Sequence, residues 1–548
     1  MKYRFDCGCE FDITNCDIKN NDGLPGIYID YENIPEDCPA TWALIQSGQT
    51  KGVFQLEANL GRHWSKTLTP HNLTEMSALI SLIRPGCLRA VVDGKSMTQH
   101  YCDRKNAGDE VKYFHSALEP ILSETYGVLT YQEQSMKIAQ AIALFDLQAA
   151  DILRKAIGKK KADIMSKVKG DFIDGCVKGG IVTEEEAEEI FGWIQESQRY
   201  SFNKSHGISY GLMGYWSAYV KAHFPFHFYT SWLYYSHEKM DPQEEMQLLV
   251  SDARYFNIDV KPPSLKQIKN GNIGHFSLNN NCVYFGLGDV KGIGESLVTK
   301  IINNVEYVEN LLGRTIDKWT WSDFLIHFSD TVSTTAINGM VASGATDYMD
   351  GSRVKKIHEY ETWKSLTQKE RDWIKDNYGE KDLIDAIQAM VENKPRTTQP
   401  RKQKIADLLK NAKKAPFSLK DTPYYIATKE TELLGVPITY TKLDTCNTNS
   451  TPDTTCKEFL QGKNGKMIIS VEITESKEYI IKKGKMKGQK MCFLTGEDNT
   501  GSIDTIIVFP KVLENNEPFL IKGATVCLTG SRDRQRSDSF IVDRIQQI

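Results

Sequence analysis

Residues 502–509 read Ser502-Ile503-Asp504-Thr505-Ile506-Ile507-Val508-Phe509 and residues 524–529 read Ala524-Thr525-Val526-Cys527-Leu528-Thr529, and these alternating stretches decide the fold of the carboxy-terminal part. A period of two is typical of strands, because successive side chains of a strand point to opposite faces of a sheet. From about residue 467 to the end, with Gly and Asn turns between, the pattern predicts about five strands, which suits a small closed barrel.

Toward the amino terminus the periodicity becomes helical, and apolar side chains recur at helical spacing between about residues 41 and 237. Thr183 is expected to cap one of these helices, since Glu184-Glu185-Glu186 would then place negative charge on its first turn. Residues 254–350 are expected to alternate short strands with small helices, and the stretch to about residue 440 to be helical and polar. The sequence therefore predicts a multidomain, mainly α chain that ends in a β-barrel.

The overall charge excludes a basic protein of the histone type. Lys and Arg total 67 and Asp and Glu total 71, a formal charge of −4, so any affinity for nucleic acid must come from local patches. No apolar core follows the charged start Met1-Lys2-Tyr3-Arg4, and the most apolar stretch, 210–235, is interrupted by Lys221 and Pro225. Neither secretion nor a membrane span is expected, and the expected compartment is cytoplasmic.

Four cysteines lie near the amino terminus, namely Cys7, Cys9, Cys16 and Cys38. They could bind zinc, but their spacing fits poorly with the paired pattern of structural zinc sites. We therefore expect free thiols, with zinc as the alternative, among loops and short strands over residues 1–40.

A first basic patch lies in residues 151–170, which carry seven positive and two negative charges. Arg154 and Lys155 precede Gly158, and Lys159-Lys160-Lys161 follow it. A helix end at this glycine would gather the cations toward one anion, such as a polyphosphate or a nucleic-acid backbone. The alternative is a solvated helix face.

A second polar cluster lies between aromatic residues in Tyr200-Ser201-Phe202-Asn203-Lys204-Ser205-His206-Gly207. Its Asn, Lys, Ser and His, with Tyr210 one turn on, are more polar than a core can easily satisfy. A phosphate or sugar contact is therefore favoured over a satisfied core histidine.

Two further stretches are basic. Residues 391–414 carry eight basic and two acidic side chains around Pro395 and Pro400, and they read as a basic connector. The hairpin expected at residues 477–490 carries six lysines and one glutamate. Such a hairpin could contact a single strand, although solvated lysines on an edge strand are the alternative.

Seven blocks of the sequence occur in a characteristic order. They are Gly52-Val53-Phe54-Gln55-Leu56-Glu57, Ile83-Arg84-Pro85-Gly86, residues 125–134, residues 153–161, Phe202-Asn203-Lys204-Ser205-His206, residues 284–295 and Lys429-Glu430-Thr431-Glu432-Leu433-Leu434-Gly435. The first five resemble the fingers region of the alpha subunit of bacterial DNA polymerase III, the C family of replicative polymerases. The sixth resembles its helix-hairpin-helix part, and the barrel is similar to its OB-fold. The resemblance runs from about residue 34 to the end.

This resemblance implies which residues would contact the substrates. The residues expected at the incoming dNTP are Arg154, Lys155, Lys159, Asn203, Lys204 and His206. The residues expected at DNA are Arg84, Lys291, Gly292, Gly294, Lys482, Lys483, Lys485 and Lys487.

The glycine-rich block at residues 284–295 has a physical reading of its own. Gly292-Ile293-Gly294 would form a tight hairpin whose backbone N–H groups meet a DNA phosphate without reading sequence. A dinucleotide-binding reading fails, because the glycine spacing is G-x-G-x-x-x-G and no ribose-binding acid follows in a βαβ context.

The family's metal-binding carboxylates belong to a palm that precedes the fingers and carries paired aspartates. Nucleotidyl transfer needs these carboxylates to hold Mg²⁺. We find no such motif, and Asp6 is only a weak candidate for one of the carboxylates. The expectation is therefore a DNA-directed DNA polymerase half, inactive until a separate palm chain supplies the Mg²⁺ site.

The expected organisation is an irregular segment (1–40), polymerase fingers (41–237), a helix-hairpin-helix DNA-binding region (238–350), a helical basic connector (351–440) and an OB-fold (441–548). The expected partners are primed template DNA, dNTP, the palm chain and a sliding clamp, with no membrane. The expected setting is the cytoplasm of a bacterial cell, including one that hosts a virus encoding the chain.

Some alternatives stay open at this point. For a sliding clamp, Gln403-Lys404-Ile405-Ala406-Asp407-Leu408-Leu409 is a faint candidate motif that also fits an ordinary amphipathic helix. The alternative function is a non-catalytic DNA-binding replication accessory protein. A small-molecule enzyme such as an NAD dehydrogenase is disfavoured, because no Rossmann or P-loop motif is found.

Overall fold

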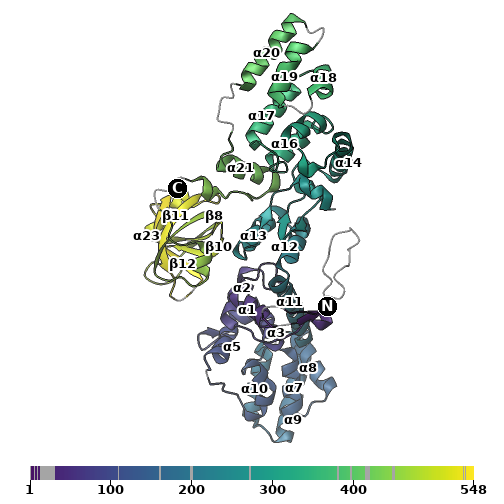
Figure 1. Ribbon diagram of the computed structural model, residues 1–548. Helices are drawn as coiled ribbons and strands as arrows, with labels where there is room; N and C mark the ends of the chain where they lie inside the picture. The colour runs from purple at the N-terminus through teal and green to yellow at the C-terminus, as the bar shows by residue number, and fades with distance from the viewer. Residues whose placement is uncertain are drawn as a thin grey trace. The chain divides into compact units, whose positions relative to one another are not determined.

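The structure is a computed structural model, and it describes residues 2–4, 7–8, 10–12, 31–108, 110–159, 162–197, 201–270, 273–378, 382–394, 398–413, 420–446, 451–534, 536 and 538–548. The chain forms two compact units (Figure 1). The first unit is Met1–Cys16 with Ile27–Pro225, and the second is Asp17–Gly26 with Phe226–Ile548.

The first unit is helical, as the sequence predicts. Its helices are α1 (Pro39–Ser47), α2 (Asn59–Leu68), α3 (Leu73–Leu82), α4 (Pro85–Arg89), α5 (Met97–Asn106), α6 (Glu119–Leu122), α7 (Gln132–Ile142), α8 (Leu147–Lys159), α9 (Ala162–Gly179), α10 (Glu184–Ser197) and α11 (Lys204–His223). The unit also has two short hairpins. Strands β1 (Lys2–Arg4) and β2 (Glu10–Asp12) precede α1, and strands β3 (Val91–Val92) and β4 (Lys95–Ser96) lie between α4 and α5.

Helices α3 and α11 pack closely because α11 carries small residues on the face toward α3. A Cβ at Gly207 would lie 2.7 Å from the hydroxyl oxygen of Ser77, and a Cβ at Gly214 would lie 2.8 Å from Cε of Met76. A side chain at either glycine would therefore push the two helices apart. This contact fixes the start of α11 over α3.

Helices α6 to α10 surround a separate core of the first unit, which includes Leu129, Ile142, Phe172 and Phe191. The start of α10 confirms the expected cap. The backbone N–H of Glu186 donates to the hydroxyl oxygen of Thr183 at 3.2 Å, and the Glu186 carboxylate accepts from the Thr183 backbone at 2.8 Å. Two backbone donors at this helix end, those of Thr183 and Glu186, are thereby satisfied.

The second unit begins with a long helical part. Its helices are α12 (Pro225–Tyr234), α13 (Pro242–Tyr255), α14 (Glu295–Leu312), α15 (Trp321–Asp323), α16 (Thr334–Ala342), α17 (Arg353–Lys364), α18 (Gln368–Tyr378), α19 (Leu383–Asn393), α20 (Gln399–Lys413) and α21 (Pro423–Leu434). A small sheet with strand order β5 (Val260–Lys261), β7 (Cys282–Tyr284) and β6 (Ser277–Asn279) lies between α13 and α14 in the chain.

The unit ends in the predicted barrel, which is closed and has five strands in the order β10-β12-β11-β8-β9. The strands are β8 (Lys466–Ile480), β9 (Lys490–Asp498), β10 (Gly501–Val508), β11 (Thr525–Arg532) and β12 (Ser539–Gln547), with α22 (Cys456–Leu460) before β8 and α23 (Pro510–Leu513) after β10. Strands β10 and β12 are parallel, and the other neighbours are antiparallel. The alternating side chains of residues 502–509 and 524–529 fill its core, among them Ile503, Ile506, Val508, Val526 and Leu528. This architecture fits an OB-fold.

Strand β8 is long enough to pair with two neighbouring strands of the barrel. Its first half, up to Glu472, pairs with β11, whereas residues 475–480 pair with β9. All six side chains of residues 475–480 are exposed.

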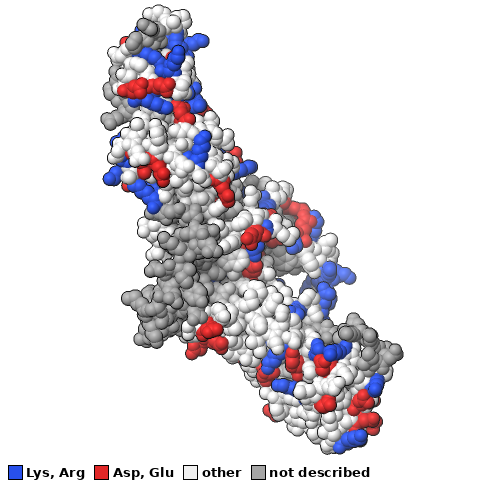
Figure 2. All heavy atoms as spheres, turned by 90° about the vertical axis from the view of Figure 1, so that its right-hand side faces the viewer, with Lys and Arg blue, Asp and Glu red and all other residues white. Residues whose placement is uncertain are grey.

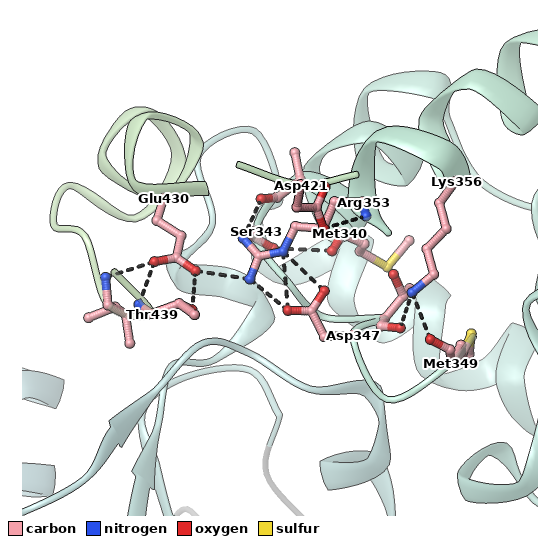
Figure 3. A network of polar contacts seen from close by, with 12 residues as sticks. Met340, Ser343, Asp347, Met349, Arg353, Lys356, Asp421, Glu430 and Thr439 are labelled. Carbon is pink, nitrogen blue, oxygen red and sulfur yellow. Dashed lines mark hydrogen bonds and ion pairs between the residues drawn. The ribbon is translucent and has the colours of Figure 1, made fainter. Parts of the chain in front are cut away.

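A buried ion network joins α17 to α21 (Figure 3). The Arg353 guanidinium donates to Asp347 at 2.6 Å and to Glu430 at 2.9 Å, and its side chain is 1% exposed. The Glu430 carboxylate also accepts from the backbone N–H groups of Ile438 and Thr439 and from the Thr439 hydroxyl. One charged pair thus ties the end of the helical part to the segment that leads into the barrel.

Among the described residues, no helix is both long and apolar enough to cross a membrane. On the face that Figure 2 shows, basic and acidic side chains are interspersed. This distribution agrees with the small net charge, and it leaves local side-chain clusters as the places to look for a function.

Candidate nucleic-acid interface

An array of aromatic rings and cations lies at the start of α11. The Arg84 guanidinium carbon lies 3.4 Å from the ring centroid of Phe202. The His206 ring packs against Phe202 at 5.2 Å and against Tyr210 at 3.9 Å, and Tyr210 packs against Phe54 at 5.1 Å. We call Phe54, Arg84, Phe202, His206 and Tyr210 the α11 array.

The members of the α11 array come from three separate sequence blocks, and the fold brings them together. Phe202 is buried, whereas His206 is exposed and Arg84 and Tyr210 are half-buried. Burial lowers the pKa of the Arg84 guanidinium, although the nearby Cys87 and Tyr210 act to raise it. The result is a surface with flat rings and at least one cation, which can stack on a base or meet a phosphate.

Two acidic side chains hold the segment that carries the array. Asn203 caps α11 by accepting from the His206 backbone at 2.9 Å, and its amide donates to Glu133 at 2.7 Å. Glu133 also accepts from the Lys204 backbone at 2.9 Å, and the Lys204 ammonium lies 2.6 Å from Glu124. Asn203 and Lys204 therefore position the helix start, and the charge of Lys204 has a partner within the chain.

The loop beneath this helix start is organised by buried Gln134. Its amide oxygen accepts from the backbone N–H groups of Thr130 and Tyr131 at 3.0 and 2.9 Å, and its amide nitrogen donates to the Thr125 hydroxyl at 2.7 Å. Residue Tyr131 in turn pairs with Phe202 as an isolated parallel bridge. The block at residues 125–134 thus has a structural role, namely to seat Phe202.

Buried Lys221 holds the turn that carries Phe54, as Gln134 holds the loop before α7. Its ammonium donates to the carbonyl oxygens of Gln49 and Lys51, both at 2.9 Å. The Phe54 backbone N–H donates to the Ser217 hydroxyl at 3.0 Å. Helix α11 therefore anchors the turn that carries Phe54, and its first turns supply His206 and Tyr210 to the array.

Arg154 and Lys155 form a second basic group, on α8. Both pair with Asp151 on the same helix, at 2.8 Å for Arg154 and 2.6 Å for Lys155. These bonds lower the pKa of Asp151, with the Lys155 bond the largest cause. Because these two ion pairs are largely solvent-accessible, they contribute little to stability. An incoming anion could compete with Asp151 for both cations.

The glycine-rich block of the second unit forms the turn between a 3₁₀ helix (Leu287–Asp289) and α14. Gly292 has φ +90°, a conformation that other residues rarely adopt. Gly294 precedes α14 as its N-cap. His275 lies beside the turn, 3.2 Å from Asp289, and the bond to Asp289 is the main cause of its raised pKa.

The side chain of Lys291 is exposed, and its backbone N–H donates to Leu433 at 2.9 Å. A hollow of about 450 Å³ next to it is lined by Thr334, Asn338, Tyr425 and Lys429, among others. The turn and α21 therefore each present one lysine, Lys291 and Lys429, at a concave surface, as contact with a phosphate backbone would need.

The turn between β8 and β9 carries four exposed lysines, which we call the lysine turn. They are Lys482, Lys483, Lys485 and Lys487. Of the flanking lysines, Lys477 pairs with Glu475 at 3.8 Å and Lys490 with Glu478 at 3.0 Å. In the described parts of the chain, no ion pair involves the lysine turn.

A shallow groove of about 510 Å³ runs beside the lysine turn. Lys482, Lys483 and Lys485 line it together with Tyr479, Met491 and Phe509. Tyr479 is 41% exposed. Cations beside an exposed ring are the combination that binds single strands without reading sequence.

Comparison with known proteins identifies the origin of these features. Residues 13–180 match the family model described as the finger domain of the bacterial DNA polymerase III alpha subunit. The alpha subunit of DNA polymerase III from Aquifex aeolicus is 35% identical over 329 residues, 60% of this chain and 27% of that protein. Part of this chain thus resembles the bacterial DNA polymerase III alpha subunit.

Other alpha subunits of DNA polymerase III agree with this result. That of Thermus aquaticus is 35% identical over 337 residues, 61% of this chain and 26% of that protein. That of Escherichia coli K12 is 35% identical over 280 residues, 50% of this chain and 23% of that protein. The chain thus spans about a quarter of the length of these alpha subunits.

The finger-domain match includes Arg84, Arg154 and Lys155, whereas Asn203, Lys204 and His206 lie beyond it. The structure places the predicted dNTP residues in two groups, one at the start of α11 and one on α8. Lys159 belongs to α8 by its backbone, but its side chain is outside the described residues, as are Lys160 and Lys161. Asp6, Cys9 and Cys16 are also outside them. The assigned binding roles stay predictions.

Several residues that build this site were not expected from the sequence. Glu124 and Glu133 are acidic, so they gave no signal for an anion-binding site, yet they orient Lys204 and Asn203. Lys221 gave a signal, because a charge inside an apolar helical run needs buried partners. For the clamp candidate in α20, Ile405 is buried and helices α17 and α19 pack against α20.

Proposed function

We propose that this chain is the fingers and DNA-binding portion of a C-family replicative DNA polymerase. In this proposal the first unit holds the incoming dNTP, and the glycine-rich hairpin and the barrel hold the primed template. The carboxylates that bind Mg²⁺ come from a palm outside these 548 residues.

The observation that carries the proposal is the α11 array. Sequence blocks that resemble the polymerase fingers, separated by more than a hundred residues, converge on Phe202, His206 and Arg84. A triphosphate needs cations at its outer oxygens, because charge moves onto pyrophosphate as the bond to the primer forms. Arg154 and Lys155 on α8 are the cations offered to it, His206 of the array offers a ring nitrogen, and Arg84 stays with the template DNA.

The described residues do not fit the metal chemistry of the palm. Their only group of three or more His, Cys, Asp or Glu side chains close enough to share an ion consists of Cys7, Cys38 and His223. Mg²⁺ prefers oxygen ligands, so this group does not suit it. The proposal therefore assigns binding and orientation to this chain, and no metal-dependent step.

The test combines the purified chain with a palm-bearing amino-terminal portion of a polymerase III alpha subunit, a primed template, Mg²⁺ and dNTPs. We expect template-directed extension only when both polypeptides are present. His206→Ala should weaken the binding of dNTP, measured as a higher KM, whereas His237→Ala, which changes an exposed histidine of the second unit, should not.

Two results would contradict the proposal. Extension by the chain alone would place the catalytic carboxylates within it. Tight DNA binding without extension in the mixture, while the palm portion is folded and binds the chain, would favour the non-catalytic accessory protein.

A further inference from the structure

Two thiols and an imidazole from three distant segments meet at one point of the first unit. The sulfur of Cys38 lies 3.1 Å from Nε2 of His223 and 3.9 Å from the sulfur of Cys7. All three ligand atoms lie within 4.8 Å of one another. We propose that Cys7, Cys38 and His223 bind a zinc ion that ties these segments together.

The spacing of the two sulfurs suits a single zinc ion. A tetrahedral zinc with Zn–S bonds of about 2.3 Å holds two sulfurs about 3.8 Å apart. The observed 3.9 Å between the sulfurs of Cys7 and Cys38 agrees with this value. A disulfide does not explain the approach, because bonded sulfurs lie only about 2 Å apart.

The donor set also selects the metal. Thiolate and imidazole are the ligands that zinc takes in structural sites, whereas Mg²⁺ and Ca²⁺ prefer oxygen. Three protein ligands leave one position of a tetrahedral ion for a further donor. The inference is independent of the proposed polymerase function, because it rests on these atoms alone.

The surroundings hold the ligands in place. Cys38 is fully buried just before α1, where its side chain makes no capping bond. Its backbone N–H donates to the Tyr215 hydroxyl at 3.1 Å, and that hydroxyl donates to the Pro35 carbonyl oxygen at 2.6 Å. The His223 ring packs on Tyr219 at 4.4 Å. Such outer contacts orient metal ligands in known sites.

The proposed site would give the short hairpin at the amino terminus a fixed place. Strands β1 and β2 have three residues each, and Cys7 lies in the turn between them. Two strands of this length are not stable alone. Zinc bound by Cys7 would fix the hairpin to the start of α1 and to the last residue of α11, His223.

Metal content of the full-length protein is the first test. We expect about one zinc per purified chain by mass spectrometry of the metal, as for other structural zinc sites. Cys38→Ser and His223→Ala should each remove most of it. Cys282→Ser, which changes a half-buried thiol of the second unit, should keep it.

A spectroscopic test does not depend on how the variants fold. Zinc is removed from the wild-type protein with a chelator and Co²⁺ is added. We expect thiolate-to-cobalt charge-transfer bands in the near ultraviolet of the wild-type protein, because Cys7 and Cys38 supply two thiolates.

The opposite results would overturn the inference. They are a wild-type protein that neither contains nor takes up zinc, a stoichiometric iron content, or a Cys38→Ser protein with full zinc.

Discussion

Replacing Arg353 by Met should strongly destabilise the second unit. The Arg353 side chain is 1% exposed and the Glu430 side chain is 0% exposed, and their charges lie 2.9 Å apart. Arg353 also contacts Asp347, but Asp347 is 45% exposed and can be hydrated when the guanidinium is removed. The loss therefore falls on Glu430, which would keep a buried charge without its cation.

The magnitude follows from what Glu430 retains. Breaking a buried ion pair by removing one partner costs about 3–5 kcal/mol. Glu430 would still accept from the backbone of Ile438 and from the backbone and hydroxyl of Thr439. These donors stabilise the carboxylate, so we expect a loss near the lower end, about 3 kcal/mol in free energy of unfolding.

Urea denaturation followed by tryptophan fluorescence measures this change, since Trp321 and Trp363 are buried in the same region. Adding Glu430→Gln to Arg353→Met should restore part of the stability, because the amide oxygen still accepts but carries no charge. Lys429→Met is the matched control, because Lys429 lies next to Glu430 in α21 but forms an exposed ion pair. Its partner Glu432 is 56% exposed, so about 0–0.5 kcal/mol is expected. A loss below about 1 kcal/mol for Arg353→Met would refute the reasoning.

Three further predictions concern binding and pH. Arg154→Ala should lower kcat/KM for dNTP in the reconstituted enzyme by on the order of a hundredfold, with DNA affinity much less changed. Steady-state kinetics at saturating DNA measure this effect. Weakened DNA binding with an unchanged dNTP KM would instead assign Arg154 to the template. Changing the lysine turn to Gln should flatten the plot of log affinity for single-stranded DNA against log salt by about 0.7 for each phosphate that the protein no longer neutralises, and an unchanged slope would show that these lysines are merely solvated. Burial raises the pKa of Glu497 to about 7, above about 4.3 in the unfolded chain, so the folded state holds the proton more tightly and stability should fall as pH rises between these two values. Glu497→Gln should abolish that fall in thermal melts, and an equal fall in both proteins would contradict the prediction.

The sequence predicted those elements whose pattern is local. The alternation in residues 502–509 appears as β10, because strand periodicity is set by neighbours along the chain. Thr183 caps α10 as expected, since a cap joins residues three positions apart. The region 295–350 is more helical than expected. Its first helix, α14, has 18 residues and buries Val298, Ile301, Val305 and Val308 at helical spacing, a local pattern that the prediction of small helices did not use.

The candidate site was predictable only in part, because its geometry depends on long-range contacts. The sequence singled out Lys204 and His206 as a polar cluster, but it did not show that Glu124 neutralises Lys204. Zinc binding by the amino-terminal cysteines, Cys7 and Cys38 among them, was disfavoured because their spacing does not match known zinc motifs. The third ligand, His223, lies 185 residues beyond Cys38, so no motif of fixed spacing could include it.

The second half of β8 has a consequence for how such a protein can change during evolution. Residues 475–480 contribute no buried side chain to the barrel. Selection for core packing therefore places no demand on their side chains or on those of the lysine turn. Mutations there can alter the positive charge of this surface in small steps while the barrel core stays packed. Under the proposed function, affinity for DNA can in this way be adjusted to a different salt concentration without loss of the fold.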